Sequence, residues 1–259
     1  MASSSVKVGL RIRPLLSKER GQTTTINVAD ESSLAFKGQT FTYDHVFPSD
    51  LSQNDLYTQT AAPMLKGFLE GYNVTIMAYG QTGSGKTFTM GTTDVSEQSS
   101  ENLGLIPRFV ADLFENLEGS VSENEKTSFK MKVSFLEIYG EDVYDLIGVN
   151  STSRQTGEAP SKSNNTSLPV REDESGRVFV QGQNEVDVYD ADSTLQLLST
   201  GTGNRITAST AMNAGSSRSH AVFTVFLEQT VQSTASEDDI HVMTSKLTFV
   251  DLAGSERIK

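Results

Sequence analysis

The sequence predicts an α/β fold in a single domain. Two kinds of segment alternate along the chain: some have the apolar patterns of β-strands, and in others the apolar residues recur at helical spacing. One short apolar run, Val74 to Tyr79, leads directly into the glycine-rich stretch Gly80 to Thr87, as in a strand–loop–helix unit. A chain of 259 residues is long enough to bury a sizeable core of its own.

The N-terminal part is expected to contain two strands and a helix. Residues 6–13 alternate apolar and polar side chains, and Pro14 ends this strand because it lacks the N–H that a central strand needs. Residues 41–47 form a second expected strand. An amphipathic helix is predicted over residues 52–70, since Ser52 to Asp55 resembles a capping box and apolar residues then recur at roughly helical spacing.

The next elements alternate between strand and helix. The run at residues 74–79 is almost continuously apolar, so we expect a strand that is buried on both faces. Residues 105–117 place their apolar side chains on one face of a helix, and residues 129–135 alternate as a strand. The remaining expected elements are a helix at 193–200 and strands at 178–180, 185–188, 221–231 and 246–250.

One stretch, residues 148–167, is expected to be a flexible polar insertion within the domain formed by residues 1–259. Eleven of its twenty residues are Ser, Thr or Asn, and no apolar periodicity survives there.

Composition excludes several classes of protein. The formal net charge of −12 argues against a general nucleic-acid binder, whose contact surface would be basic. The sequence has no apolar run near 18 residues, so no membrane span is expected. With no cysteine, the chain has neither disulfides nor thiol metal ligands, which fits a reducing cytosol.

The glycine-rich stretch has the spacing of a phosphate loop. Its glycines let the backbone turn tightly with N–H groups pointing inward, and the following helix presents its positive N-terminal end to the same anion. A lysine at this spacing reaches the β- and γ-phosphates, and the next hydroxyl can bind Mg²⁺. The candidate residues are Gly80, Gln81, Thr82, Gly83, Ser84, Gly85, Lys86 and Thr87.

Two further motifs accompany this loop. The apolar strand that ends at Asp251 offers a carboxylate for Mg²⁺, and the backbone of Gly254 could approach a γ-phosphate. Residues 213–220, NAGSSRSH, gather three serines, an arginine and a histidine before a strand. Each motif alone also has an ordinary explanation as a chance match, a common turn or a polar loop. Their occurrence on one chain favours a nucleotide site.

These motifs, in this order, resemble those of the kinesin motor domain. GQTGSGKT is similar to its phosphate loop, NAGSSRSH to its first switch and DLAGSE to its second switch. RIRP, VSFLEIYGEDVYDLI, VREDESGRVFVQG and TASTAMN also resemble kinesin segments, and the chromokinesin-like branch is the most similar. The resemblance runs from about Val6 to Lys259. It implies a kinesin-motor-like mixed central β-sheet with helices on both faces.

The resemblance also assigns roles around ATP and Mg²⁺. It implies that Arg11, Arg13 and Pro14 flank the adenine while the Phe88 ring stacks on it, and that residues 80–87 hold the triphosphate. Preference for ATP over GTP depends on the resemblance alone, because no base-reading residue could be identified from the sequence.

Around the last phosphate, the resemblance implies that Ser216 and Ser217 contact Mg²⁺, the γ-phosphate or the attacking water. Thr87 and Asp251 complete the metal site. Arg218 would form an ion pair with Glu256 that closes the two switches, and Gly254 would sense the γ-phosphate. His220 would have a supporting hydrogen-bond role.

A kinesin motor domain continues well beyond the second switch, so the C-terminal part of the domain is expected to be missing here. The absent part would include most of the microtubule-binding face, the last strand, the neck linker and any stalk through which the parent protein could dimerise. This would leave a sheet edge open and explain the acidic net charge. One contact region remains, in which Arg177 matches a basic contact position.

Three functions are therefore considered. The first is a cytoplasmic, cytoskeletal motor that couples Mg-ATP hydrolysis to movement on microtubules, with the present chain itself expected to be non-motile. The second is a nucleotide- or tubulin-binding fragment without turnover. The third, a different phosphate-loop ATPase or GTPase, is disfavoured because NAGSSRSH and DLAGSE occur together.

Overall fold

A mixed β-sheet forms the centre of the molecule. The computed structural model describes residues 6–19, 21–22, 24–92, 99–123, 127–148, 167–211, 218–232 and 240–256. The strands of the central sheet follow the order β11-β7-β12-β13-β6, and β8 pairs with β7. β6 runs parallel to β13, whereas the other neighbours are antiparallel. Their bounds are β6 Val74–Ala78, β7 Thr127–Tyr139, β8 Asp142–Asp145, β11 Val186–Val188, β12 Ser219–Gln232 and β13 Ile240–Asp251. The predicted mixed sheet is confirmed.

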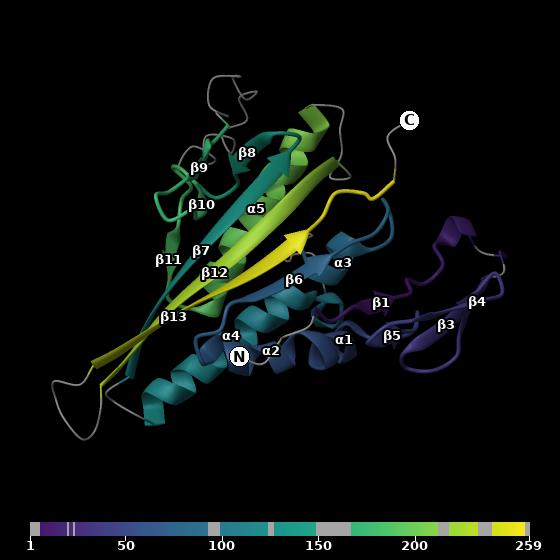
Figure 1. The fold of residues 1–259 in the computed structure, drawn as a ribbon, viewed down its shortest axis with the longest axis horizontal. Coiled ribbons are helices and arrows are strands. Elements are labelled where there is room, and N and C mark those ends of the chain that lie inside the picture. Colours follow the sequence, from purple (N-terminus) through teal and green to yellow (C-terminus); the bar gives the residue numbers. More distant parts are fainter. Residues whose placement is uncertain are drawn as a thin grey trace.

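Helices pack against the face of the sheet that carries Phe135 and Phe249. The ring of Phe109 on α4 lies 5.8 Å from that of Phe249, and a Cβ on Gly201 of α5 would collide with Phe135. Figure 1 shows the long strands β7, β12 and β13 side by side with α5 behind them. Helices on the opposite face stay a prediction. The helices are α1 Gln53–Thr60, α2 Ala62–Leu69, α3 Lys86–Met90, α4 Leu105–Glu123 and α5 Ala191–Ala211.

Aromatic side chains fill the space between this face and the helices. Phe68, Phe109, Phe135 and Phe223 are fully buried, and they form edge-to-face pairs with centroid distances of 5.5 to 6.1 Å. Each such side chain removes a large apolar area from water, and this packing is the main stabilising contribution that the central sheet receives.

The prediction that β6 is buried on both faces is wrong. Its exposure alternates along the strand, so that Thr75 and Met77 are exposed while their neighbours face the helices. Met77 is 61% exposed. A continuous apolar run therefore does not distinguish a doubly covered strand from one whose second face is open.

The N-terminal lobe, residues 9–47, forms two small sheets beside the central one (Figure 1). β1 (Gly9–Arg11) runs parallel to β5 (His45–Phe47). β2 (Ile26–Val28), β3 (Ser33–Phe36) and β4 (Gln39–Thr42) form an antiparallel sheet, and a short 3-10 helix, η1, covers Ser17–Glu19. The strand predicted over residues 41–47 is thus two strands that belong to different sheets.

The helix predicted over residues 52–70 is divided into α1 and α2 at Ala61. The predicted cap is present, because the Ser52 hydroxyl accepts a hydrogen bond from the Asp55 N–H at 3.0 Å. Pro63 lies in the first turn of α2, where a missing N–H is tolerated, and it prevents a continuous helix through this point.

The remaining elements are small. β9 (Val170–Glu172) and β10 (Val178–Val180) form an antiparallel hairpin, and a second 3-10 helix, η3, spans Ser100–Asn102. Of the insertion predicted at 148–167, residues 149–166 lie outside the described ranges. Within those ranges, no helix has both the length and the apolar character to cross a bilayer.

Candidate nucleotide-binding site

The glycine-rich loop connects β6 to α3, as the motif predicts. Gly83 and Gly85 have φ angles of 74° and 98°, in the left-handed region that favours glycine. A Cβ on Gly80 would come within 2.6 Å of the Ser84 hydroxyl. The tight loop therefore depends on these glycines for its conformation and for its close approaches.

Lys86, the first residue of α3, turns back over this loop. Its ammonium group donates hydrogen bonds to the carbonyl oxygens of Gly80, at 2.8 Å, and of Gln81, at 3.0 Å. These contacts hold the positive charge of the ammonium group against the loop. A cation at this place can pair with an anion that binds to the loop N–H groups.

Asp251 lies at the end of β13, directly beside α3. Its carboxyl oxygen Oδ2 accepts a hydrogen bond from the Thr87 hydroxyl at 2.8 Å. The other oxygen, Oδ1, is buried and has no hydrogen-bond partner among the described residues. A carboxylate with a free buried oxygen next to a hydroxyl offers the oxygen ligands that Mg²⁺ prefers. Thr87 and Asp251 therefore fit a magnesium ion.

Arg205, which sequence reasoning missed, contacts the same carboxylate. It lies on α5 with only 3% of its surface exposed, and it donates to Asp251 Oδ2 at 3.0 Å. Its Nε lies 3.8 Å from Glu137, and Nη2 donates to the Ser219 carbonyl oxygen at 3.0 Å. One buried guanidinium thus compensates two buried carboxylates. One signal was available: Arg205 is the one charged residue in the sequence between Asp192 and Arg218.

The DLAGSE segment is held against the glycine-rich loop. The Glu256 carboxylate accepts hydrogen bonds from the hydroxyl and, at 2.9 Å, from the N–H of Thr82. The Ser255 N–H donates to the Gly80 carbonyl oxygen at 3.1 Å. The bond from the Thr82 hydroxyl is the main reason why the pKa of Glu256 is lowered. A Cβ on Gly254 would lie 2.5 Å from the same hydroxyl, so a larger residue would separate the two segments.

The predicted ion pair between Arg218 and Glu256 is not formed in this structure, although both residues lie within the described ranges. Arg218 is exposed directly before β12, and the Glu256 carboxylate is bound to Thr82 instead. The physical reason is that the Thr82 N–H offers the Glu256 carboxylate a hydrogen-bond donor close by.

His220 joins the two switch motifs. Its Nδ1 accepts a hydrogen bond from the Ala253 N–H at 2.9 Å, a contact that is compatible with the predicted supporting role. Ser216 and Ser217 lie outside the described residues, so their predicted contacts stay predictions.

The predicted base-binding residues come from α3, which contains Phe88, and from the end of β1, with Arg11 and, following it, Arg13 and Pro14. The guanidinium carbon of Arg11 is 5.5 Å from the centroid of the Phe88 ring, which is 41% exposed. Arg13 also lies near the loop, but its guanidinium forms a bidentate pair with Glu19 at 2.7 and 2.8 Å and donates to the Pro14 carbonyl oxygen. Arg11, Arg13, Pro14 and Phe88 thus share one region, while Arg13 already has a partner for its charge.

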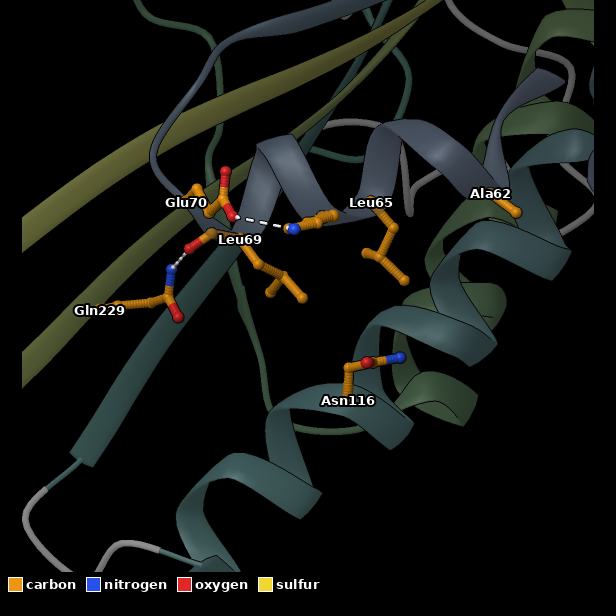
Figure 2. A pocket seen from close by; sticks show the side chains of 7 residues that line it. Ala62, Leu65, Leu69, Glu70, Asn116 and Gln229 are labelled. Atoms are coloured by element: carbon orange, nitrogen blue, oxygen red, sulfur yellow. Dashed lines mark hydrogen bonds and ion pairs between the residues drawn. The ribbon is translucent and has the colours of Figure 1, made fainter.

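Two other features lie outside this region. Arg177 is exposed at the β9–β10 hairpin and pairs with Asp173 at 3.5 Å. A hollow of about 530 Å³ opens between α2, α4 and β12, where Leu65 and Asn116 project from facing helices and Gln229 donates to the Leu69 carbonyl oxygen at 2.7 Å (Figure 2). None of the predicted nucleotide-site residues lines this hollow.

The structure has a glycine-rich loop between a sheet strand and a helix. A lysine turns back over this loop, and a threonine donates a hydrogen bond to an aspartate at the end of a strand. This arrangement defines the phosphate-loop NTPase fold class. The model of the kinesin motor domain family matches residues 11–259. The chain therefore belongs to the kinesin motor domain family.

Individual relatives agree with this assignment. The chain is 40% identical over 259 residues to chromosome-associated kinesin KIF4 of Xenopus laevis and 39% identical over 260 residues to kinesin-like protein kif7 of Danio rerio. Both matches cover 98% of this chain, but only 20% and 18% of the relatives. The chain thus spans about a fifth of their length.

The fold is also similar to a solved structure of a fast kinesin, reported with implications for ATPase mechanism and interactions with microtubules. The TM-score is 0.82 at 30% sequence identity, and the match covers 98% of this chain and 67% of that one.

Proposed function

We propose that this chain binds Mg-ATP at the glycine-rich loop and that the protein to which it belongs hydrolyses ATP to move along microtubules. The observation that carries this proposal is the convergence of Lys86, Thr87 and the free buried oxygen of Asp251 at one end of the sheet. Membership of the kinesin family supports the motor activity.

Within this proposal, the loop N–H groups and Lys86 hold the phosphates, and Arg11, Arg13, Pro14 and Phe88 surround the base. When bound, Mg²⁺ would compensate the negative charge of the phosphates. Thr87, Asp251 and Ser216 would be its protein ligands. The remaining residues assigned to the γ-phosphate are Ser217, Arg218, Gly254 and Glu256.

The contact between Glu256 and Thr82 suggests how nucleotide binding moves the second switch. Phosphates that bind to the loop N–H groups compete with the Glu256 carboxylate for Thr82, because both are anions that need the same donor. Glu256 is then released to pair with Arg218. This exchange of partners would connect the loading of the site to the position of the DLAGSE segment.

Microtubules are the proposed partner, and the cytoplasmic microtubule cytoskeleton is the proposed location. Arg177, exposed on the β9–β10 hairpin, is proposed to contact tubulin. We propose no contact with nucleic acid or membrane, and we propose that the parent protein dimerises through a stalk. The second candidate is nucleotide or tubulin binding without turnover.

Calorimetry with Mg-ADP tests nucleotide binding. We expect Lys86→Ala to weaken the affinity about tenfold or more, because the phosphates lose a charged partner. Lys66→Ala, which alters an exposed lysine on α2, is the matched control and should bind as the unaltered chain does. If the unaltered chain takes up no Mg-ADP, the proposed site is wrong.

Turnover measured with and without microtubules separates the two candidates. Stimulation of ATP hydrolysis by microtubules in this chain would favour the motor function. Uptake of nucleotide with no hydrolysis under either condition would favour the binding function.

A further inference from the structure

Gln53, the first residue of α1, is a buried polar side chain to which the sequence assigned no function. Only 4% of its surface is exposed. Its amide oxygen accepts a hydrogen bond from Arg11 Nη1 at 2.7 Å, and its amide nitrogen donates to the Phe88 carbonyl oxygen at 2.8 Å and to the Asn102 carbonyl oxygen at 3.3 Å. These partners fix which end of the amide faces which segment, and they compensate its burial.

Two of these partners determine how the Phe88 ring is presented. The amide nitrogen holds the backbone of Phe88 itself. The amide oxygen holds Arg11, whose guanidinium also donates to the Thr89 hydroxyl at 2.8 Å and lies 5.5 Å from the Phe88 ring centroid. Gln53 therefore fixes both the residue that carries the ring and the cation beside it.

We propose that Gln53 is a positioning residue that holds Phe88 and Arg11 in the pose required to stack on the nucleotide base. This inference rests on the proposed function, which places the base at Phe88. It adds that the contribution of the base to affinity depends on an amide that does not touch the nucleotide. The ring is 41% exposed, so it has surface available for stacking.

A purely structural role predicts something different. Through Asn102, the same amide also fastens η3 to α1, and Arg108 holds this segment from the other side by donating to Ser100 and Leu103 carbonyl oxygens. If Gln53 served only this attachment, its loss would weaken the binding of every ligand to the same degree. If Gln53 positions the ring, its loss would weaken the binding of the base and leave the binding of the phosphates unchanged.

Two variants and one control separate these roles. Gln53→Met removes both ends of the amide at similar size. Gln53→Glu keeps an acceptor for Arg11 but replaces the donor to Phe88 with an oxygen that repels its carbonyl. Gln59→Met changes an exposed glutamine on the same helix and is the matched control.

Calorimetry should compare Mg-ADP with Mg-pyrophosphate, because both carry two phosphates and only one carries a base. We expect both Gln53 variants to bind Mg-ADP about tenfold more weakly, which is the size of one lost stacking contact, and to bind Mg-pyrophosphate within about twofold of the unaltered chain. The control should bind both ligands normally. Equal losses for the two ligands, or no loss in either variant, would overturn the inference.

A double-mutant cycle tests whether Gln53 acts through the ring. In a Phe88→Leu background, Gln53→Met should no longer change the ratio of the two affinities, because the stacking surface is already absent. A ratio that changes as much as it does with the ring present would contradict the inference. If the unaltered chain binds neither ligand, the proposed nucleotide site fails instead.

A measurement on the unaltered chain covers the case in which the variants do not fold. In protein labelled with ¹⁵N-glutamine, the Gln53 side-chain amide signal should shift on addition of Mg-ADP and stay in place on addition of Mg-pyrophosphate. Equal shifts with both ligands, or none with either while ADP binds, would count against a role in positioning the base.

Discussion

The end of the central sheet around Asp251 and the N-terminal lobe both contain an arginine that binds a carboxylate, but in different surroundings. The side chains of Arg205 and Asp251 are 4% and 1% exposed, whereas those of Arg13 and Glu19 are 30% and 21% exposed. A buried charge that loses its partner remains without water, while an exposed one is hydrated at once. The pair with the shorter, bidentate hydrogen bonds, Arg13 and Glu19, is therefore expected to contribute less to stability than the buried pair.

Apolar side chains are also more deeply buried in the central sheet than in the N-terminal lobe. The sheet buries Phe135 and Phe223 completely. In the lobe Leu34, Val46 and Phe47 are buried, but three other apolar side chains are between 37% and 43% exposed, namely Ile26, Val28 and Phe41. The central sheet should therefore determine the free energy of unfolding, and the lobe should tolerate substitution.

The largest expected effect is that of Phe223→Ala. It should lower the free energy of unfolding by about 3–5 kcal/mol, because a fully buried ring is replaced by a cavity. Phe41→Ala in the lobe should lower it by less than about 1 kcal/mol. Urea denaturation followed by circular dichroism measures both. Similar losses for the two variants would contradict the proposed difference between sheet and lobe.

The second largest expected effect on stability is that of Arg205→Met. It should lower the free energy of unfolding by roughly 3 kcal/mol, because Asp251 and Glu137 stay buried without their shared cation. Arg171→Met, at an exposed arginine on the β9–β10 hairpin, is the control and should change it little. Chemical denaturation of both variants gives the comparison. An Arg205→Met protein as stable as the control would show that the buried charges are otherwise compensated.

The smallest expected effect concerns pH and Glu19. Hydrogen bonds from the Arg13 side chain and the Leu16 N–H lower the pKa of Glu19 from its ordinary value of 4.5 to about 2. A carboxylate with a lowered pKa stabilises the folded state above its unfolded pKa, and this contribution is lost as pH falls through the folded value. The stability difference between the unaltered chain and Glu19→Gln should therefore shrink between pH of about 4.5 and about 2.

Urea midpoints across this pH range measure that difference, with Glu118→Gln on the exposed side of α4 as the control for loss of one negative charge. A difference that is constant over the whole range would mean that Glu19 does not contribute in its ionised form.

The sequence predicted the structure correctly where a short local pattern determines it. Alternation at residues 129–135 located β7, and the spacing of the glycine-rich loop placed Lys86 at the start of α3. It failed where distant segments decide the outcome. The contact of Glu256 with Thr82 depends on which donor the loop presents, and the role of Arg205 depends on two strands that bring Glu137 and Asp251 to one place. The pair of Glu256 with Arg218 stays a prediction.

Burial of β6 was misjudged for a related reason. The apolar run shows that both faces of the strand could pack against other elements. Whether a second layer of helices covers the outer face depends on other parts of the fold. Gln53 shows the reverse case: nothing local distinguishes it from the exposed Gln59, and only the packing of four segments around it makes its amide important.

The exposed position of Met77 on β6 has a chemical consequence. Peroxide reaches a thioether in solution far more readily than one inside a packed core, so Met77 should be converted to its sulfoxide before Met90 and Met131, which are 1% and 2% exposed. The added oxygen makes that stretch of the sheet edge polar. Oxidation during storage would thus appear on this strand before it appears at Met90 or Met131, as a mass increase in the peptide that precedes the glycine-rich loop.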